Sequence, residues 1–158
     1  MTAEGSNEVR RIVVGVDGSE TSRHALRWAA EEARAHGSQL HVVHAWEVPG
    51  LGAGVGVLPG RRSAQPEGQH DEASRLVADV VREELGEDPP GDVRTSIGRG
   101  PAAGVLLDAA DQADLLVVGS RGLGGFKGLL LGSVSSKMAA HASCPVVIVR
   151  PAAPQDES

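Results

Sequence analysis

The sequence predicts an α/β fold with a five-stranded, parallel, doubly wound sheet and helices on both faces. Short apolar runs alternate with segments whose small apolar residues recur at helical spacing, in the order β-α-β-α-β-α-β-α-β. One run, residues 115–118, has four consecutive apolar residues, which is typical of a strand buried on both faces. Aromatic residues make up only 2% of the chain, so we expect a core of Val, Leu, Ile and Ala.

The predicted strands are apolar runs bounded by polar or glycine-containing turns. We expect them at residues 11–17, 39–46, 93–98, 115–118 and 145–150. Because a helical segment separates each strand from the next, the crossovers should be right-handed and the strands parallel.

The predicted helices have an apolar face and recognisable end signals. The first follows Ser19, a favourable N-cap, and ends at Gly37. The second spans residues 71–85. The third has Pro101 at its first position, and the fourth runs over residues 132–141.

The length of 158 residues favours a single domain, with its core at about residues 10–151. Residues 47–70 are rich in Gly, Pro and Arg and have no hydrophobic period. Such a segment is either a lid over a site or a flexible loop, and its lack of bulky anchors favours the flexible loop.

Composition and charge exclude several classes of protein. The net charge of -6 and the absence of a long basic run argue against a nucleic-acid-binding surface. No run of 18 apolar residues is present, so we expect a cytoplasmic protein without a membrane segment. Cys144, the single cysteine, is expected to act as a small hydrophobe. His41 and His44 should lie on opposite faces of their strand, so we expect no shared metal.

A glycine-rich segment carries the clearest chemical signal. Gly119 and Gly122 follow the apolar run, and nine residues later Gly132 and Ser133 open the fourth helix. Glycines let the backbone approach an anion, and the free N–H groups of a helix N-terminus favour phosphate. The simpler alternative is that these glycines only form a turn.

Two common nucleotide motifs do not fit this segment. A Walker loop needs Gly-Lys followed by Ser or Thr, whereas the order here is Lys127-Gly128. A dinucleotide fingerprint would place its third glycine at Lys127, and the second strand ends without the acid that holds a ribose. P-loop and NAD-binding proteins are therefore disfavoured.

Three separate segments are expected to meet at one edge of the sheet. Gly15, Asp17, Ala45 and Gly119 lie at the carboxyl ends of predicted strands, which is where doubly wound folds bind ligands. Asp17 taken alone would be read as a cap of the first helix, but together with the glycine-rich segment it is better explained as a ligand contact.

These motifs resemble those of the universal stress protein family over nearly the whole chain. The resemblance rests on residues 14–19 (Val-Gly-Val-Asp-Gly-Ser), residues 43–45 (Val-His-Ala), and the family's nucleotide motif Gly-x2-Gly-x9-Gly-Ser/Thr, complete here from Gly119 to Ser133. It implies a Rossmann-like fold with strand order 3-2-1-4-5, and ATP, with or without Mg²⁺, as the ligand.

The resemblance also implies roles for individual residues. Asp17 would bind adenine or ribose, Ala45 and Val118 would pack near the base, and the start of the fourth helix would hold the phosphates. Proline can stand at the position of Gly15 in the family, so glycine there would leave a more open base pocket. The implied site comprises Gly15, Asp17, Ala45, Val118, Gly119, Ser120, Arg121, Gly122, Gly132, Ser133, Val134 and Ser135.

The expected function is nucleotide-regulated stress response or signalling by a homodimer, and not enzymatic catalysis beyond weak ATP hydrolysis. Family members commonly dimerise through the last strand, which implies pairing through Val146, Val147, Ile148 and Val149. The alternatives are a slow ATPase or a phosphoryl- or nucleotidyl-transfer enzyme, a cyclic-AMP-binding member, and an interaction module that binds no nucleotide.

Overall fold

The computed structural model describes residues 8–47, 66–89, 91–122 and 131–151. The elements alternate as β1 (Arg11–Gly15), α1 (Glu20–His36), β2 (Gln39–Trp46), α2 (Pro66–Leu85), β3 (Val93–Arg99), α3 (Ala102–Ala110), β4 (Leu115–Gly119), α4 (Ser133–His141) and β5 (Val146–Val149). The strands form one sheet in the order β3-β2-β1-β4-β5, and all neighbours are parallel. The predicted fold class and strand order are confirmed.

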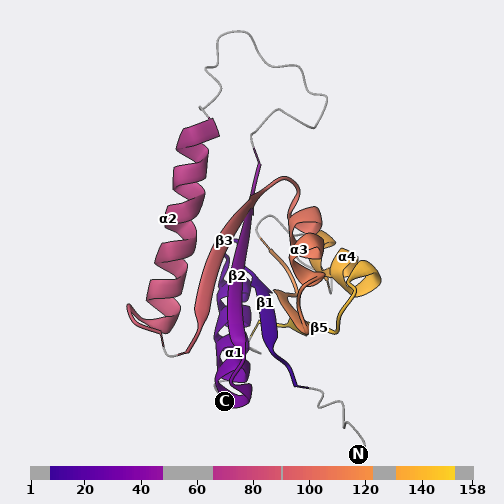
Figure 1. The fold of residues 1–158 in the computed structure, drawn as a ribbon. Coiled ribbons are helices and arrows are strands. Elements are labelled where there is room, and N and C mark those ends of the chain that lie inside the picture. The colour runs from indigo at the N-terminus through magenta and orange to yellow at the C-terminus, as the bar shows by residue number, and fades with distance from the viewer. Residues whose placement is uncertain (1–7, 48–65, 90, 123–130, 152–158) are drawn as a thin grey trace, which may run out of the picture.

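The sheet is the middle of three layers (Figure 1). One core cluster joins it to α1 and α2 and includes Ile12, Leu26 and Val80. A second cluster joins the other face to α3 and α4 and includes Val13, Leu106 and Met138. Because the central parts of β1 and β4 are covered on both faces, residues 12–14 and 116–118 are at most 3% exposed.

Helix α1 begins and ends where its capping residues predict. The backbone N–H of Ser22 donates to the Ser19 hydroxyl oxygen at 3.2 Å, so Ser19 is the N-cap. Gly37 ends the helix with a left-handed φ of 65°, a conformation that favours glycine. The turn between β1 and α1 is therefore held by its own residues.

Some predicted boundaries are wrong. Helix α2 begins at Pro66 and not at residue 71, because its first turn has no apolar residue to reveal a period, and proline suits a first helical position. Pro101 lies just before α3, with ψ at 137°. Strand β1 ends at Gly15, two residues early, because the chain turns there toward α1. Of the segment expected to be a loop, residues 48–65 lie outside the described part.

The two histidines of β2 and the single cysteine are held by separate parts of the fold. His41 bonds to Ser96 of β3, whereas His44 bonds to the carbonyl of Val16, which directly follows β1, so the two histidines have separate partners. Cys144 is half-buried against the second core cluster, and burial raises the pKa of its thiol, which disfavours a reactive thiolate. None of the helices within the described ranges is long and apolar enough to cross a bilayer.

Candidate functional site

A cleft of about 320 Å³ lies where the sheet order reverses, between the carboxyl ends of β1 and β4. Residues from the ends of β1, β2 and β4 line it, together with the start of α4 and one side of α3. Its volume is at the lower end of the range for small-molecule sites. It is lined by Gly15, Val16, Asp17, Ser22, Val43, His44, Ala45, Ala102, Leu106, Val118, Gly119, Gly122, Gly132, Ser133, Val134 and Ser135.

The structure brings together most of the residues expected at the site. The expected residues that line the cleft are Gly15, Asp17, Ala45, Val118, Gly119, Gly122, Gly132, Ser133, Val134 and Ser135. Ser120 and Arg121 are not among the lining residues. Ser120 is buried, its N–H donates to the Val149 carbonyl at 2.8 Å, and its own carbonyl accepts from Gly132, so it connects β4, β5 and α4.

Sequence reasoning missed six lining residues. Val16, Val43 and His44 belong to the motifs at residues 14–19 and 43–45, so those motifs were the available signal. Ser22 comes from the first turn of α1. Ala102 and Leu106 come from α3, and no local pattern marks them, because they reach the cleft only through the packing of α3 against the sheet.

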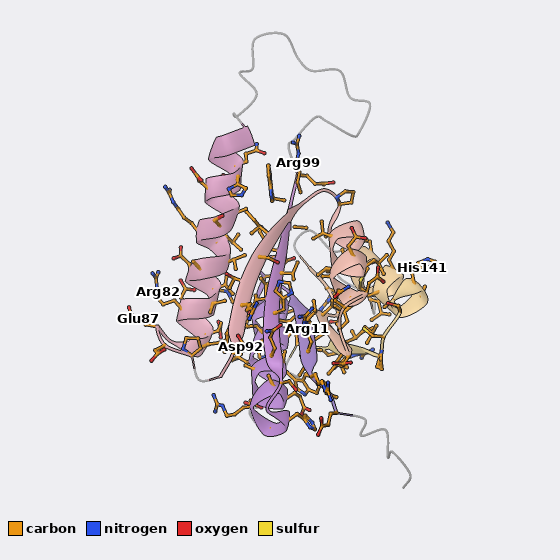
Figure 2. All side chains as sticks on the ribbon, in the orientation of Figure 1. Arg11, Arg82, Glu87, Asp92, Arg99 and His141 are labelled. Atoms are coloured by element: carbon orange, nitrogen blue, oxygen red, sulfur yellow. The ribbon has the colours of Figure 1, made fainter. Side chains whose placement is uncertain are left out.

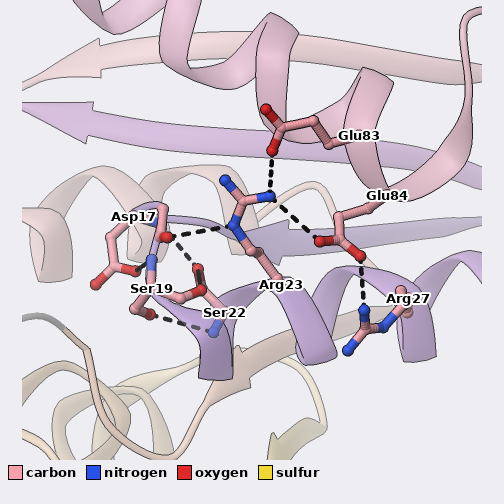
Figure 3. A network of polar contacts seen from close by, with 8 residues as sticks. Asp17, Ser19, Ser22, Arg23, Arg27, Glu83 and Glu84 are labelled. Atoms are coloured by element: carbon pink, nitrogen blue, oxygen red, sulfur yellow. Dashed lines mark hydrogen bonds and ion pairs between the residues drawn. The ribbon is translucent and has the colours of Figure 1, made fainter.

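Asp17 organises the turn between β1 and α1 (Figure 3). Its Oδ1 accepts the Ser19 N–H at 2.9 Å, and its own N–H donates to the Ser22 hydroxyl at 3.3 Å. The Ser22 hydroxyl in turn donates to the Ser19 carbonyl at 2.9 Å. Asp17 therefore does not cap α1 directly; it orients the capping residue while its carboxylate lines the cleft.

At each glycine of the motif, an added Cβ would meet a different part of the structure. A Cβ at Gly122 would lie 2.5 Å from Asp17 Oδ2, so Gly122 leaves room for that carboxylate. A Cβ at Gly119 would lie 3.1 Å from the Thr21 carbonyl carbon, so Gly119 lets α1 pack against the end of β4. Gly119 therefore has a packing reason to be glycine in addition to its predicted role in ligand approach.

The start of α4 faces the cleft with its first turn. Gly132 is the N-cap, and its N–H donates to the Ser120 carbonyl at 2.6 Å. The N–H groups of Ser133, Val134 and Ser135 belong to that turn, where no carbonyl of the same helix is in reach. The Ser135 side chain is 1% exposed and donates to the carbonyls of Ser120 and Gly132, so its hydroxyl supports the turn.

The cleft beside Gly15 is bordered by α3. The Leu106 side chain occupies this space, with its Cδ1 atom 2.8 Å from where a Cβ of residue 15 would lie. Across the described residues, no group of three or more His, Cys, Asp or Glu side chains could hold a metal ion. The cleft therefore combines an apolar wall, one carboxylate and a helix N-terminus.

Comparison with known proteins identifies the family. The model of the universal stress protein family matches residues 8–150. The chain belongs to this family. It is 40% identical over 148 residues to a universal stress protein of Mycobacterium tuberculosis, covering 87% of this chain and 46% of that protein. It spans about half the length of that relative. A universal stress protein of Thermus aquaticus is 37% identical over 146 residues, covering 89% of this chain and 98% of that protein.

Solved universal stress proteins share the fold, and some carry nucleotides. The structure from Lactobacillus plantarum superposes with a TM-score of 0.74 at 23% identity, covering 90% of this chain and 99% of the other. A universal stress protein in complex with cAMP has a TM-score of 0.63 at 28% identity, covering 90% and 98%. The Archaeoglobus fulgidus protein in complex with dAMP has a TM-score of 0.58 at 25% identity, with the same coverage.

Proposed function

We propose that the cleft binds an adenine nucleotide, with ATP as the physiological ligand, and that occupancy regulates a stress-response function. The observation that carries the proposal is that the first turn of α4 and the Asp17 carboxylate line one cleft at the switch point of the sheet. The universal stress proteins in complex with cAMP and dAMP support an adenine nucleotide as the ligand class.

Different residues of the cleft would contact the base, the ribose and the phosphates of such a ligand. Ala45, Val118 and Leu106 offer an apolar wall for the base. The Asp17 carboxylate accepts hydrogen bonds from ribose hydroxyls or the adenine amino group. The N–H groups at the start of α4 suit phosphate oxygens, and the positive end of the helix dipole favours their charge. The phosphate-binding turn selects ATP over a nucleoside.

Mg²⁺ fits this site only as a partner of the nucleotide. Asp17 is the one acid among the described residues that line the cleft. Mg²⁺ is commonly held by one or two carboxylates together with substrate phosphates and water. Asp17 is therefore the residue that would hold it, and the ion would neutralise phosphate charge.

Turnover of the nucleotide is proposed to be slow. Two titratable side chains belong to described residues of the cleft, Asp17 and His44. Asp17 Oδ1 accepts the Ser19 N–H, and His44 Nδ1 lies 2.8 Å from the Val16 carbonyl. A general base must reach the attacking water, whereas Asp17 is proposed to contact the nucleoside or Mg²⁺ and His44 Nδ1 lies against the Val16 carbonyl. The proposed role is therefore binding and not catalysis.

Dimerisation through β5 is proposed as the second part of the function. Within the described sheet β5 is an edge strand, and it consists of four apolar residues that are only half-buried. Exposed apolar edges promote pairing with another chain. A second copy that pairs antiparallel with β5 would cover both edges at once and form a two-fold dimer.

The direct test of the ligand is to identify what the protein carries. Protein purified without added nucleotide is denatured, and the released small molecules are separated and identified by mass spectrometry. We expect ATP close to one per chain. Release of cAMP would contradict ATP as the ligand, and AMP or ADP would contradict slow turnover. If nothing is released and titration with ATP and Mg²⁺ gives no heat, the proposal fails and an interaction module is favoured.

A further inference from the structure

Part of one sheet face lies outside the cleft, and no helix of the described residues lies over it. α3 covers the carboxyl end of this face, where Cβ atoms at Gly15 and Gly98 would meet Leu106 and Val105. Figure 1 shows the amino-terminal parts of β1, β2 and β3 with no helix drawn in front of them. The side chains that alternation and register place on this open part are Arg11, Gln39, His41, Arg94 and Ser96.

His41 and Ser96 form a hydrogen-bonded pair on this open face. The distance from His41 Nε2 to Ser96 Oγ is 2.7 Å, and Ser96 is exposed to solvent. Burial, followed by the charges of Arg11 and Arg94, lowers the pKa of His41, so the ring is neutral near pH 7. In the tautomer with the proton on Nδ1, Nε2 accepts the hydrogen of the Ser96 hydroxyl.

Two guanidinium groups flank the pair. Arg94 is the direct register partner of His41 on β3, and Arg11 lies two residues from the partner of His41 on β1. Arg11 Nε donates to the neutral Gln39 amide oxygen at 3.0 Å, while Asp92 accepts from Gln39 at 2.8 Å and from Arg94 at 3.4 Å. Figure 2 labels Arg11 and Asp92 on this side of the sheet. Two guanidinium groups and one carboxylate, that of Asp92, therefore surround the pair, and this net positive charge suits an anionic reagent.

Other serine hydroxyls with described contacts have supporting roles. Those of Ser22, Ser38 and Ser135 donate to backbone carbonyls. The Ser143 hydroxyl donates to Asp111, a carboxylate. Among the serine contacts that the structure describes, Ser96 is the one whose hydroxyl meets an imidazole nitrogen, which is a base at neutral pH.

We propose that Ser96 is a nucleophile activated by His41 and that it takes an acyl group from small acyl phosphates. Ser96 Oγ attacks the carbonyl carbon and forms an ester bond, and the bond from that carbon to the phosphate oxygen breaks. Inorganic phosphate leaves with the bonding electron pair. The serine proton passes to His41 Nε2 and then to phosphate or water. The two arginines attract the phosphate end of the donor.

Acetyl phosphate is a suitable test reagent because it is a small acyl phosphate. Its product at Ser96 can be located, because trypsin releases Ser96 in a short peptide. Cleavage after Arg94 and Arg99 releases residues 95–99, which contain Ser96 and Thr95 but no lysine. Thr95 is also exposed and lies on the opposite face of β3, so it is an internal control for unassisted reaction. The folded protein is incubated with acetyl phosphate at pH 7.5, and acetylation at both positions is followed by tandem mass spectrometry.

We expect Ser96 to be acetylated at least about tenfold faster than Thr95, since general-base assistance is typically worth a hundredfold or more in closed sites. His41→Gln keeps a hydrogen-bonding side chain without a base. It should reduce the Ser96 rate to that of Thr95 and leave acetylation of Lys137 unchanged. Arg94→Gln should slow reaction with acetyl phosphate but not with neutral p-nitrophenyl acetate.

Two results would overturn the proposal. The first is equal acetylation of Ser96 and Thr95 in the wild-type protein. The second is a Ser96 rate that His41→Gln leaves unchanged while circular dichroism shows a folded variant. Denatured wild-type protein is the further control, and it should lose the difference between the two hydroxyls, because the pair forms only across adjacent strands.

Discussion

Asp17 joins the turn that begins α1 to the proposed nucleotide site, and its two roles are separable. Asp17→Asn retains an Oδ1 acceptor for the Ser19 N–H, but an amide N–H₂ replaces Oδ2. We expect near wild-type stability and at least about tenfold weaker ATP binding, because a charge-assisted hydrogen bond is lost. Asp17→Ala also removes the Ser19 bond and should cost about 0.5–1.5 kcal/mol in unfolding free energy. Calorimetric titration and urea denaturation measure both effects, and unchanged ATP affinity in Asp17→Asn would contradict the assignment.

The three motif glycines should respond differently to alanine. At Gly132 the nearest atoms to an added Cβ lie 3.4 Å away, so the fold should tolerate alanine. At Gly119 the added Cβ meets the Thr21 backbone, and we expect a loss of about 1–3 kcal/mol in stability, as for other overpacked sites. At Gly122 it displaces Asp17, so binding should weaken more than stability. Equal unfolding midpoints for Gly119→Ala and Gly132→Ala would contradict this reading.

His41 should make stability depend on pH. Burial and the nearby arginines lower the pKa of His41 in the folded protein below the value near 6.5 of a free histidine. The unfolded chain therefore binds the proton first as pH falls, and the free energy of unfolding decreases from about pH 6.5 down toward the folded-state pKa. His41→Gln should remove this part of the pH dependence. Urea denaturation of both proteins at several pH values between 5 and 8 measures it, and identical profiles would refute it.

At the scale of elements, Arg23 connects the turn around Asp17 to α2. Arg23 Nη1 donates to Glu83 at 2.6 Å and to Glu84 at 3.2 Å, and Arg23 Nε donates to the Gly18 carbonyl (Figure 3). Arg27 also donates to Glu84. We expect a coupling of about 0.5–1 kcal/mol between Arg23→Gln and Glu84→Gln in a double-mutant cycle, decreasing with salt. Additive effects at low salt would show that the bridge adds no stability.

At the scale of the whole molecule, the proposed dimer depends on the outer edge of β5. The carbonyls of Pro145 and Val149 accept from β4, so by alternation the N–H of Ile148 points to the free edge. Ile148→Pro removes that donor, and Ile148→Ala loses side-chain packing but keeps the donor. We expect monomers for Ile148→Pro and dimers for Ile148→Ala in analytical ultracentrifugation. A dimer in both variants would place the interface elsewhere.

The sequence predicts the sheet well because its signals are local. Four consecutive apolar residues in β4, the Ser19 cap and Gly37 each determine their own neighbourhood, and the alternation of strands and helices predicts a parallel sheet. The strand order itself follows from the resemblance to the universal stress protein family. Features that arise from packing could not be predicted. They include the contribution of Leu106 to the cleft, the contact of Gly119 with Thr21, and the pairing of His41 with Ser96.

The central claim is that N–H groups of the first turn of α4 hold the nucleotide phosphates, and Ser133 tests it most directly. Ser133→Pro deletes one N–H group at the first position of α4, where helices tolerate proline. The preceding residue, Gly132, has a φ of -76° and a ψ of 173°, an extended conformation that suits a residue before proline. Ser133→Ala removes the hydroxyl but keeps the N–H. Calorimetric titration with ATP and Mg²⁺ should show at least about tenfold weaker binding for Ser133→Pro than for Ser133→Ala, since a hydrogen bond to a charged group is worth about 1.5–3 kcal/mol. Equal affinity of two folded variants would contradict the claim.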